Sequence, residues 1–178
     1  MKKTWQTLIV FFTCAISFEA SADILLVYAG PKVGYSIKGW TFSADDYRSS
    51  SGSANKIPPL GGGLSVGGTA GIKLFNFIGA QTSLCWYDLD DPGNITSWTL
   101  EVVLGPTIAD FLELGALVGV GSQWLNSDAN LALKAGALLG LRLHEWFEVG
   151  VNADADFWWF EKYAAANITL SAWLRLTI

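Results

Sequence analysis

The segment from Leu143 to Phe160 alternates between apolar and polar residues. Every second residue from Phe147 belongs to an apolar face that ends at Trp159. The positions between them include three carboxylates, Glu148, Asp154 and Asp156. A period of two is the pattern of a β-strand that separates two environments. The segment therefore predicts a strand with one face suited to hydrocarbon and the other suited to polar groups.

The same alternation recurs in seven other segments, and the glycines within them argue against helices. These segments are 30–39, 63–74, 77–86, 96–105, 112–124, 130–143 and 167–178. We predict that their aliphatic positions share one face of a sheet, for example Leu100, Leu114, Leu133, Val151 and Leu170. The opposite face would then hold Glu101, Gly115, Lys134, Asp154 and Ser171.

The connections between these segments are of two kinds. Short links that close on an aromatic residue, "LFNF", "TIADF" and "LHEWF", alternate with polar links, "DLDDPGN", "NSDA", "EKYAA" and the long loop 41–59. An even strand count with one rim of tight turns and one rim of polar loops is typical of an outer-membrane β-barrel, with the turns on the periplasmic side. We therefore expect eight antiparallel strands from about residue 25 to 178, with the first strand paired to the last so that no edge is open.

The character of the two faces indicates which one points outward. The aliphatic face is the more continuous one, whereas the other face carries Gly, Ser, Thr, Asn and charged residues, which suit a narrow lumen. A soluble barrel would need the large aliphatic residues inside. That inverted arrangement stays open as an alternative.

Aromatic residues on the apolar face gather near the ends of the predicted strands. Those at the loop ends are Trp86, Trp98, Trp124 and Trp159, and those beside the short turns are Phe111 and Phe147. Aromatic rings at both ends of an apolar band are favoured at membrane interfaces. We predict two interface belts from these six residues.

Residues 1–22 have the layout of a cleavable secretory signal peptide: Lys2 and Lys3, an apolar run, and the small residues Ala20-Ser21-Ala22. Residues 23–178 are then expected to form a single domain, exported to the cell envelope. This part contains one cysteine, Cys85, so no disulfide can form within it. The chain has a formal net charge of −5, which argues against nucleic acid as a partner.

The predicted domain resembles the small eight-stranded outer-membrane proteins of the OmpA/OmpX type, and the phrases "LFNFIGAQ", "FLELGALVGVG" and "WFEVGVNADAD" carry the resemblance. The resemblance implies an all-β, eight-stranded, antiparallel up-and-down transmembrane barrel in the bacterial outer membrane, inserted by the outer-membrane assembly machinery. Proteins of this type commonly end in an aromatic residue, whereas this sequence ends in Ile178. Because the alternation from Leu170 to Ile178 is kept, recognition by that machinery is still expected, in an atypical form.

Charged residues on the predicted inward face nearly balance. The cations are Lys32, Lys38, Lys73, Lys134, Arg142 and Arg175, and the anions are Glu101, Glu113, Glu148, Asp154 and Asp156. The interior of an eight-stranded barrel is only wide enough for side chains, so these charges should pair and close the lumen.

Turn positions predict which charges meet. A hairpin folded about Glu145 places Arg142 opposite Glu148, and Lys134 opposite Asp156. A hairpin folded about the middle of "NSDA" would place Glu113 beside Arg142. We expect a cluster of Glu113, Arg142 and Glu148, with Arg175 adjoining it.

The sequence indicates no catalytic set, no metal site and no cofactor. His144 lies in a short turn without a nearby serine, Cys85 is expected to fill space in the lumen, and "DLDDPGN" lacks the spacing of a calcium loop. We therefore predict a plugged barrel with a structural or surface-recognition role, with an extracellular ligand at loop 41–59 as one option. The alternatives are a narrow, porin-like channel or a binding protein for a small or hydrophobic ligand. A lipid-modifying enzyme is favoured less.

Overall fold

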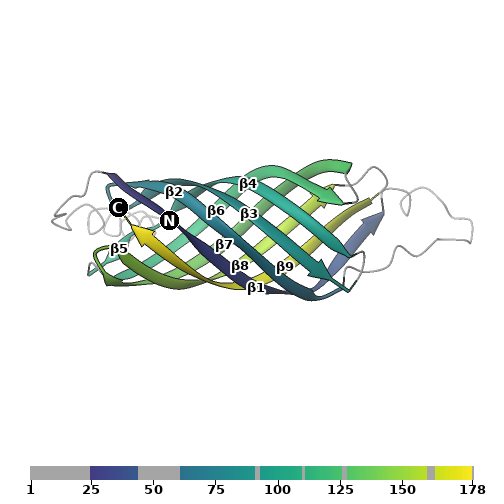
Figure 1. Cartoon of the computed structure of the whole chain (residues 1–178). Helices are drawn as coiled ribbons and strands as arrows, with labels where there is room; N and C mark the ends of the chain where they lie inside the picture. The colour runs from purple at the N-terminus through teal and green to yellow at the C-terminus, as the bar shows by residue number, and fades with distance from the viewer. Residues whose placement is uncertain are drawn as a thin grey trace, which may run out of the picture.

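The computed structural model describes residues 25–43, 61–90, 93–109, 111–125, 128–159 and 163–177, which form one β-barrel (Figure 1). The strands are β1 (Leu25–Ser43), β2 (Gly63–Leu74), β3 (Ile78–Leu89), β4 (Asn94–Leu104), β5 (Thr107–Ile108), β6 (Leu112–Leu125), β7 (Asp128–His144), β8 (Phe147–Trp159) and β9 (Tyr163–Thr177). Within these ranges, no helix is long and apolar enough to cross a membrane. The signal-peptide prediction for 1–22, most of loop 41–59 and the terminal Ile178 lie outside the described residues.

The barrel is closed and antiparallel. Each long strand pairs with its neighbour in the chain, β4 pairs with β6, and β1 pairs with β9. The short β5 is a two-residue extension of the β4–β6 turn, where Thr107 pairs with Glu113. The prediction of eight antiparallel strands, with the first paired to the last, is thus confirmed. Each of the eight long strands has a hydrogen-bonded neighbour on both sides.

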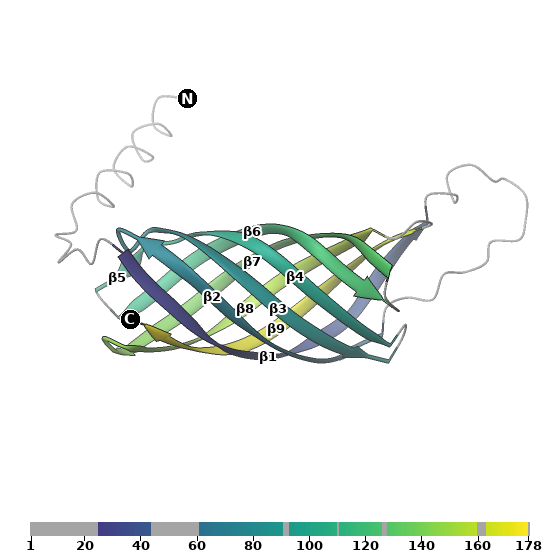
Figure 2. The ribbon, with the colours of Figure 1, turned by 45° about the horizontal axis from the view of Figure 1, so that its top comes forward.

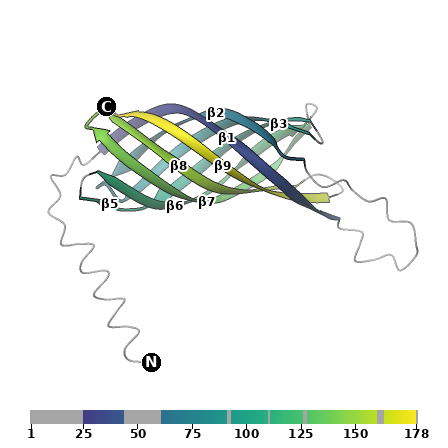
Figure 3. The ribbon, with the colours of Figure 1, turned by 90° about the horizontal axis from the view of Figure 1, so that it is seen from below.

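The strands are strongly inclined to the barrel axis, as Figures 2 and 3 show from two sides. Following the pairing from Lys32 through β2, β3, β4 and β6 reaches β7 at Asn130. Following it from Lys32 through β9 and β8 reaches β7 at Gly140 instead. This stagger sets the strand tilt and makes residues meet across the lumen that are distant in the sequence.

Several strands extend beyond the predicted segments. The first strand begins at Leu25 and continues to Ser43, after an irregularity between Ile37 and Trp40, so Thr41–Ser43 pair with β9 rather than belong to the first loop. Residues Tyr163–Ala166 likewise belong to β9 and not to a link. Polar composition led to an expectation of loops here, but pairing between these two strands overrides it.

Burial alternates along the strands as the pattern predicts. Leu100 is 54% exposed whereas the next residue, Glu101, is 1% exposed. Leu114, Leu133, Val151 and Leu170 are also exposed on the outside, while Lys134, Asp154 and Ser171 are buried inside. The assignment of the two faces is therefore confirmed, and the inverted barrel with aliphatic residues inside is wrong.

Backbone hydrogen bonds tie the turns together at one end of the barrel, which we call the turn end. Thr107 N donates to Asn76 O over 3.2 Å, Arg142 N donates to Phe111 O over 2.7 Å, and Thr177 N donates to Trp146 O over 3.1 Å. Each bond joins one connection to a neighbouring strand or turn. The opposite end, where residues 44–60, 91–92, 126–127 and 160–162 connect the strands, is called the loop end.

Candidate functional site

The lumen is the candidate site, because it gathers the charged residues that the sequence places on one face. Lys32, Lys73, Lys134, Glu101, Glu113, Glu148, Asp154, Asp156 and Arg175 are all buried, and Arg142 is partly buried. Each of these charges belongs to an ion pair with a residue of opposite sign. The side chain of the remaining predicted cation, Lys38, lies outside the described part.

Ion pairs at the turn end involve five side chains from five strands. The Glu113 carboxylate lies 2.7 Å from Lys73 Nζ and 3.4 Å from Arg175 Nη1. Arg142 Nε donates to Glu148 Oε1 over 2.8 Å. Because β6 approaches β2 and β9 across the lumen, Glu113 is shared between two cations.

The pairings at the turn end correct one part of the predicted cluster. Arg142 is opposite Glu148, and Lys134 is opposite Asp156, as predicted. The expected neighbour relation between Glu113 and Arg142 is wrong, since Glu113 pairs with Gly140. The β6–β7 hairpin closes with Leu125 opposite Asp128, one position earlier than the middle of "NSDA". Arg175 adjoins Glu148 in the register, as expected.

A second group of charges lies deeper in the barrel, towards the loop end. Lys134 Nζ lies 3.2 Å from Glu101 Oε1 and 3.8 Å from Asp156 Oδ1, and all three side chains are 1% exposed. Lys32 on β1 forms a separate pair with Asp154 on β8, over the intervening strand β9. The burial of isolated charges is costly, so this matching of opposite charges is what makes a charged lumen tolerable.

Polar side chains link the ion pairs around Glu113 to those around Lys134. The Arg175 guanidinium donates to Gln81 Oε1 over 3.0 Å, and Gln81 donates in turn to Glu101. The Arg175 guanidinium carbon also lies 4.4 Å from the ring centre of Tyr28 and 4.0 Å from that of Trp173. Arg175 is thus held by a carboxylate, an amide and two aromatic faces, contacts that suit its planar cation.

Two clusters of apolar side chains are also buried in the lumen, which the description of the inward face as polar did not anticipate. Val103, Leu117 and Leu138 form one buried cluster, and Val103 is the register partner of Leu117. Their signal was present in the sequence, since all three stand at inward positions of the alternation.

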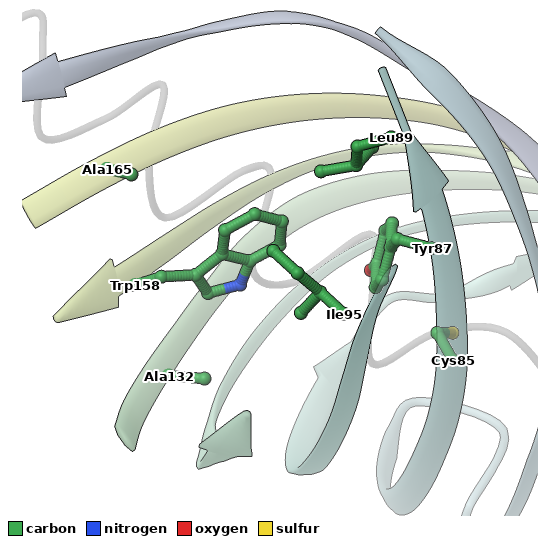
Figure 4. Packing of buried hydrophobic residues seen from close by; sticks show 7 residues of the cluster. All are labelled: Cys85, Tyr87, Leu89, Ile95, Ala132, Trp158 and Ala165. Atoms are coloured by element: carbon green, nitrogen blue, oxygen red, sulfur yellow. The ribbon is translucent and has the colours of Figure 1, made fainter. Parts of the chain in front are cut away.

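A larger apolar cluster lies in the lumen near the loop end (Figure 4). Its members are Cys85, Tyr87, Leu89, Ile95, Ala132, Trp158 and Ala165. The rings of Tyr87 and Trp158 meet edge to face, with centres 5.5 Å apart. Tyr87 also donates to Asp156 Oδ2 over 3.3 Å, so this cluster contacts the ion pairs below it. Cys85 fills space in the lumen, as predicted.

The predicted belt residues lie on the outer surface. Trp86, Trp98, Trp159 and Phe111 are exposed, and Trp124 and Phe147 are partly exposed. Sequence reasoning missed three further aromatic residues at the turn end, Phe75, Phe77 and Trp146, which are also exposed. All three stand in the short links, and the belt prediction did not include them. The role of all these rings at a membrane interface stays a prediction.

His144 and Cys85, which the sequence analysis weighed for catalysis, lie at opposite ends of the described barrel. His144, the last residue of β7, is exposed, and its ring centre lies 5.1 Å from that of Trp146 in the following turn. Cys85 lies in the apolar cluster, which does not include His144. Among the described residues, no group of three or more His, Cys, Asp and Glu side chains could hold a metal ion.

Comparison with known proteins identifies the fold. No protein-family model and no curated protein matches the sequence. The structure is similar to Neisserial surface protein A, NspA, with a TM-score of 0.55 and 10% identity over 88% of this chain and 99% of that one. It is also similar to the outer membrane protein OprG from Pseudomonas aeruginosa, with a TM-score of 0.53 and 8% identity over 86% of this chain and 95% of that one. The chain therefore has the fold of the small eight-stranded outer-membrane β-barrels.

Proposed function

We propose that the chain is an integral protein of a bacterial outer membrane, with a lumen closed by its own side chains and a structural or surface-recognition role. The observation that carries the proposal is the reversal of the usual polarity of a protein. Large aliphatic side chains such as Leu100 and Val118 are exposed around the outside, while ten charged side chains pair within. An apolar surface of this extent is stable only against hydrocarbon.

The interior supports a plugged barrel over a porin-like channel. The ion pairs around Glu113 occupy the turn end, the Val103 cluster follows, and the Trp158 cluster occupies the loop end. Ions would have to pass two apolar clusters and separate buried ion pairs, which is costly in a narrow lumen. We infer that the chain conducts no ions and catalyses no reaction. In this arrangement the turns face the periplasm and the loops face outward, after export directed by residues 1–22.

Refolding into phospholipid vesicles tests the proposal. We expect the unboiled protein to migrate faster on a gel than the boiled protein, because a closed barrel resists detergent unfolding. We also expect planar bilayers that contain it to show no channel steps. Steady conductance would favour the narrow-channel alternative, and recovery of the folded protein without detergent or lipid would contradict membrane insertion.

A charge placed on the outer surface tests whether this surface faces lipid or water. Leu100→Arg should lower the free energy of unfolding in vesicles by about 2–4 kcal/mol, because the side chain faces hydrocarbon near the middle of β4. Leu100→Met, measured by the same urea titration, should change it by less than about 1.5 kcal/mol. Equal stability of the two variants would show that this face does not contact lipid.

A further inference from the structure

The outer surface carries a shallow groove over β2, β3 and β4, which lie side by side in Figure 2. It encloses about 580 Å³, within the range of small-molecule sites. Small residues, Gly68, Ala70 and Thr82, line its middle. Val66, Leu84, Trp86 and Trp98 are larger side chains along it. The groove therefore arises because three adjacent strands place small residues together among large ones.

The groove is apolar along its length and amphipathic at one end. The Thr82 hydroxyl donates to the backbone oxygen of Thr99 over 3.2 Å, so its polar atom is already satisfied. Trp86 and Trp98, each less than half exposed, lie near the loop ends of β3 and β4. Ala70 lies near the middle of its strand. The groove thus leads from an aromatic end, suited to an interface, towards the middle of the apolar band.

We propose that this groove binds one acyl chain of a membrane lipid in the leaflet on the loop side, with a phospholipid as the probe in the test below. The inference rests on the proposed function, because it needs the outer surface to face a bilayer. The groove is continuous with the exposed aliphatic band, so hydrocarbon is what reaches it. The two indole rings can contact both the chain and the headgroup region, which holds the lipid at one depth.

A second groove on the outer surface gives a contrast within the same molecule. It encloses about 600 Å³ over β6 to β9 and includes Ala137, Val151 and Leu170. No aromatic residue lines it. A lipid chain there has only aliphatic contacts and exchanges with its neighbours, so we assign the bound chain to the groove with the two tryptophans.

Filling the groove tests the assignment. Ala70→Leu combined with Thr82→Leu keeps the surface apolar but occupies the space between the strands. The matched control is Ala135→Leu, an exposed alanine on β7 outside both grooves. The proteins are refolded into nanodiscs of dimyristoyl phosphatidylcholine, released in the gas phase, and weighed by native mass spectrometry with the lipid still attached.

The wild type and Ala135→Leu should retain one phospholipid that the filled variant loses. Trp98→Leu should lower the fraction of barrels that retain it, because an aliphatic side chain cannot contact the headgroup region. Equal retention by wild type and filled variant overturns the proposal, as does loss in the control or no retained lipid in the wild type. Heat-dependent gel mobility is measured on every sample, so a variant that inserts but shows the overturning pattern refutes the groove and leaves the proposed function standing. Failure of the wild type to insert refutes both.

Discussion

The two ends of the lumen contain side chains of different chemistry. At the turn end, Glu113 is shared between Lys73 and Arg175, beside the Arg142–Glu148 pair. At the loop end, Trp158, Tyr87 and Ile95 form a dense apolar cluster. A narrow lumen can thus be filled either by ion-paired side chains or by apolar side chains. The first arrangement depends on each partner being present, whereas the second depends on volume.

The largest effect is expected at the turn end from Arg175→Met. This change leaves Glu113 with a single cation and removes the contacts with Gln81, Tyr28 and Trp173. Loss of one partner of a buried ion pair costs about 3–5 kcal/mol. Equilibrium unfolding in urea with lipid vesicles measures it.

The control for this change is Arg175→Lys, which keeps the charge but loses the planar guanidinium. Its stability should fall between those of the wild type and Arg175→Met, because a lysine cannot stack on both rings while reaching Glu113 and Gln81. If Arg175→Met unfolds at the same urea concentration as the wild type, the turn-end network contributes nothing to stability.

A smaller loss is expected at the loop end from Ile95→Ala. The Ile95 side chain is fully buried, so its truncation leaves a cavity and should cost about 2–4 kcal/mol. Ile95→Val, the matched control, should cost about 0.5–1.5 kcal/mol. Both losses should be the same at low and high salt, because Ile95 carries no charge. An Ile95→Ala protein as stable as the wild type would mean that the loop-end cluster is loosely packed.

The sequence predicts the fold better than it predicts the ion pairs, for physical reasons. Alternation assigns each side chain to a face because successive Cβ atoms in a strand point to opposite sides. The register between β7 and β8 was also predictable, since the tight turn at Glu145 leaves little freedom. The "NSDA" link has no residue that specifies the turn type, and the register of β6 against β7 was therefore misassigned.

Contacts across the lumen could not be predicted from hairpins at all. The Lys73–Glu113 and Lys32–Asp154 pairs join strands that are not neighbours in the sheet. Their geometry depends on the stagger of the closed barrel, which is a property of all the registers together. The alternation places Val103, Leu117 and Leu138 on the inward face, but it does not predict that these three side chains contact one another.

A still smaller effect is expected from Arg142, and it tests whether the Arg142–Glu148 pair is independent of the ion pairs of Glu113. Among the described residues, Arg142 forms an ion pair with Glu148 alone, and its side chain is 15% exposed. Arg142→Met should therefore cost about 1–2 kcal/mol after allowance for solvent screening. Adding Glu148→Gln should recover part of this loss, because it removes the carboxylate left without its partner. The two variants are compared by urea unfolding. If Glu113→Gln restores stability to Arg142→Met as well as Glu148→Gln does, the turn end is one coupled cluster and not two.

The smallest effect concerns the β2–β3 turn, which forms part of the turn-end rim. Phe75 and Asn76 have φ angles of 51° and 52°, so both adopt the left-handed conformation of a two-residue hairpin turn. Asparagine tolerates this conformation, but a bulky residue is strained there by about 1–2 kcal/mol. The ring of Phe75 is 63% exposed, so its packing offsets little of this strain.

Phe75→Gly should therefore raise the free energy of unfolding by about 0.5–1 kcal/mol in detergent micelles, after the greater chain entropy of glycine is subtracted. Phe77→Gly is the control, because Phe77 is also exposed but does not have a positive φ. This change should not raise the free energy of unfolding. In lipid vesicles the gain at Phe75 should shrink, because an aromatic ring at the rim anchors the barrel at the membrane interface. An equal gain in micelles and vesicles would mean that Phe75 does not reach the interface, and that the strain at this turn serves no anchoring role.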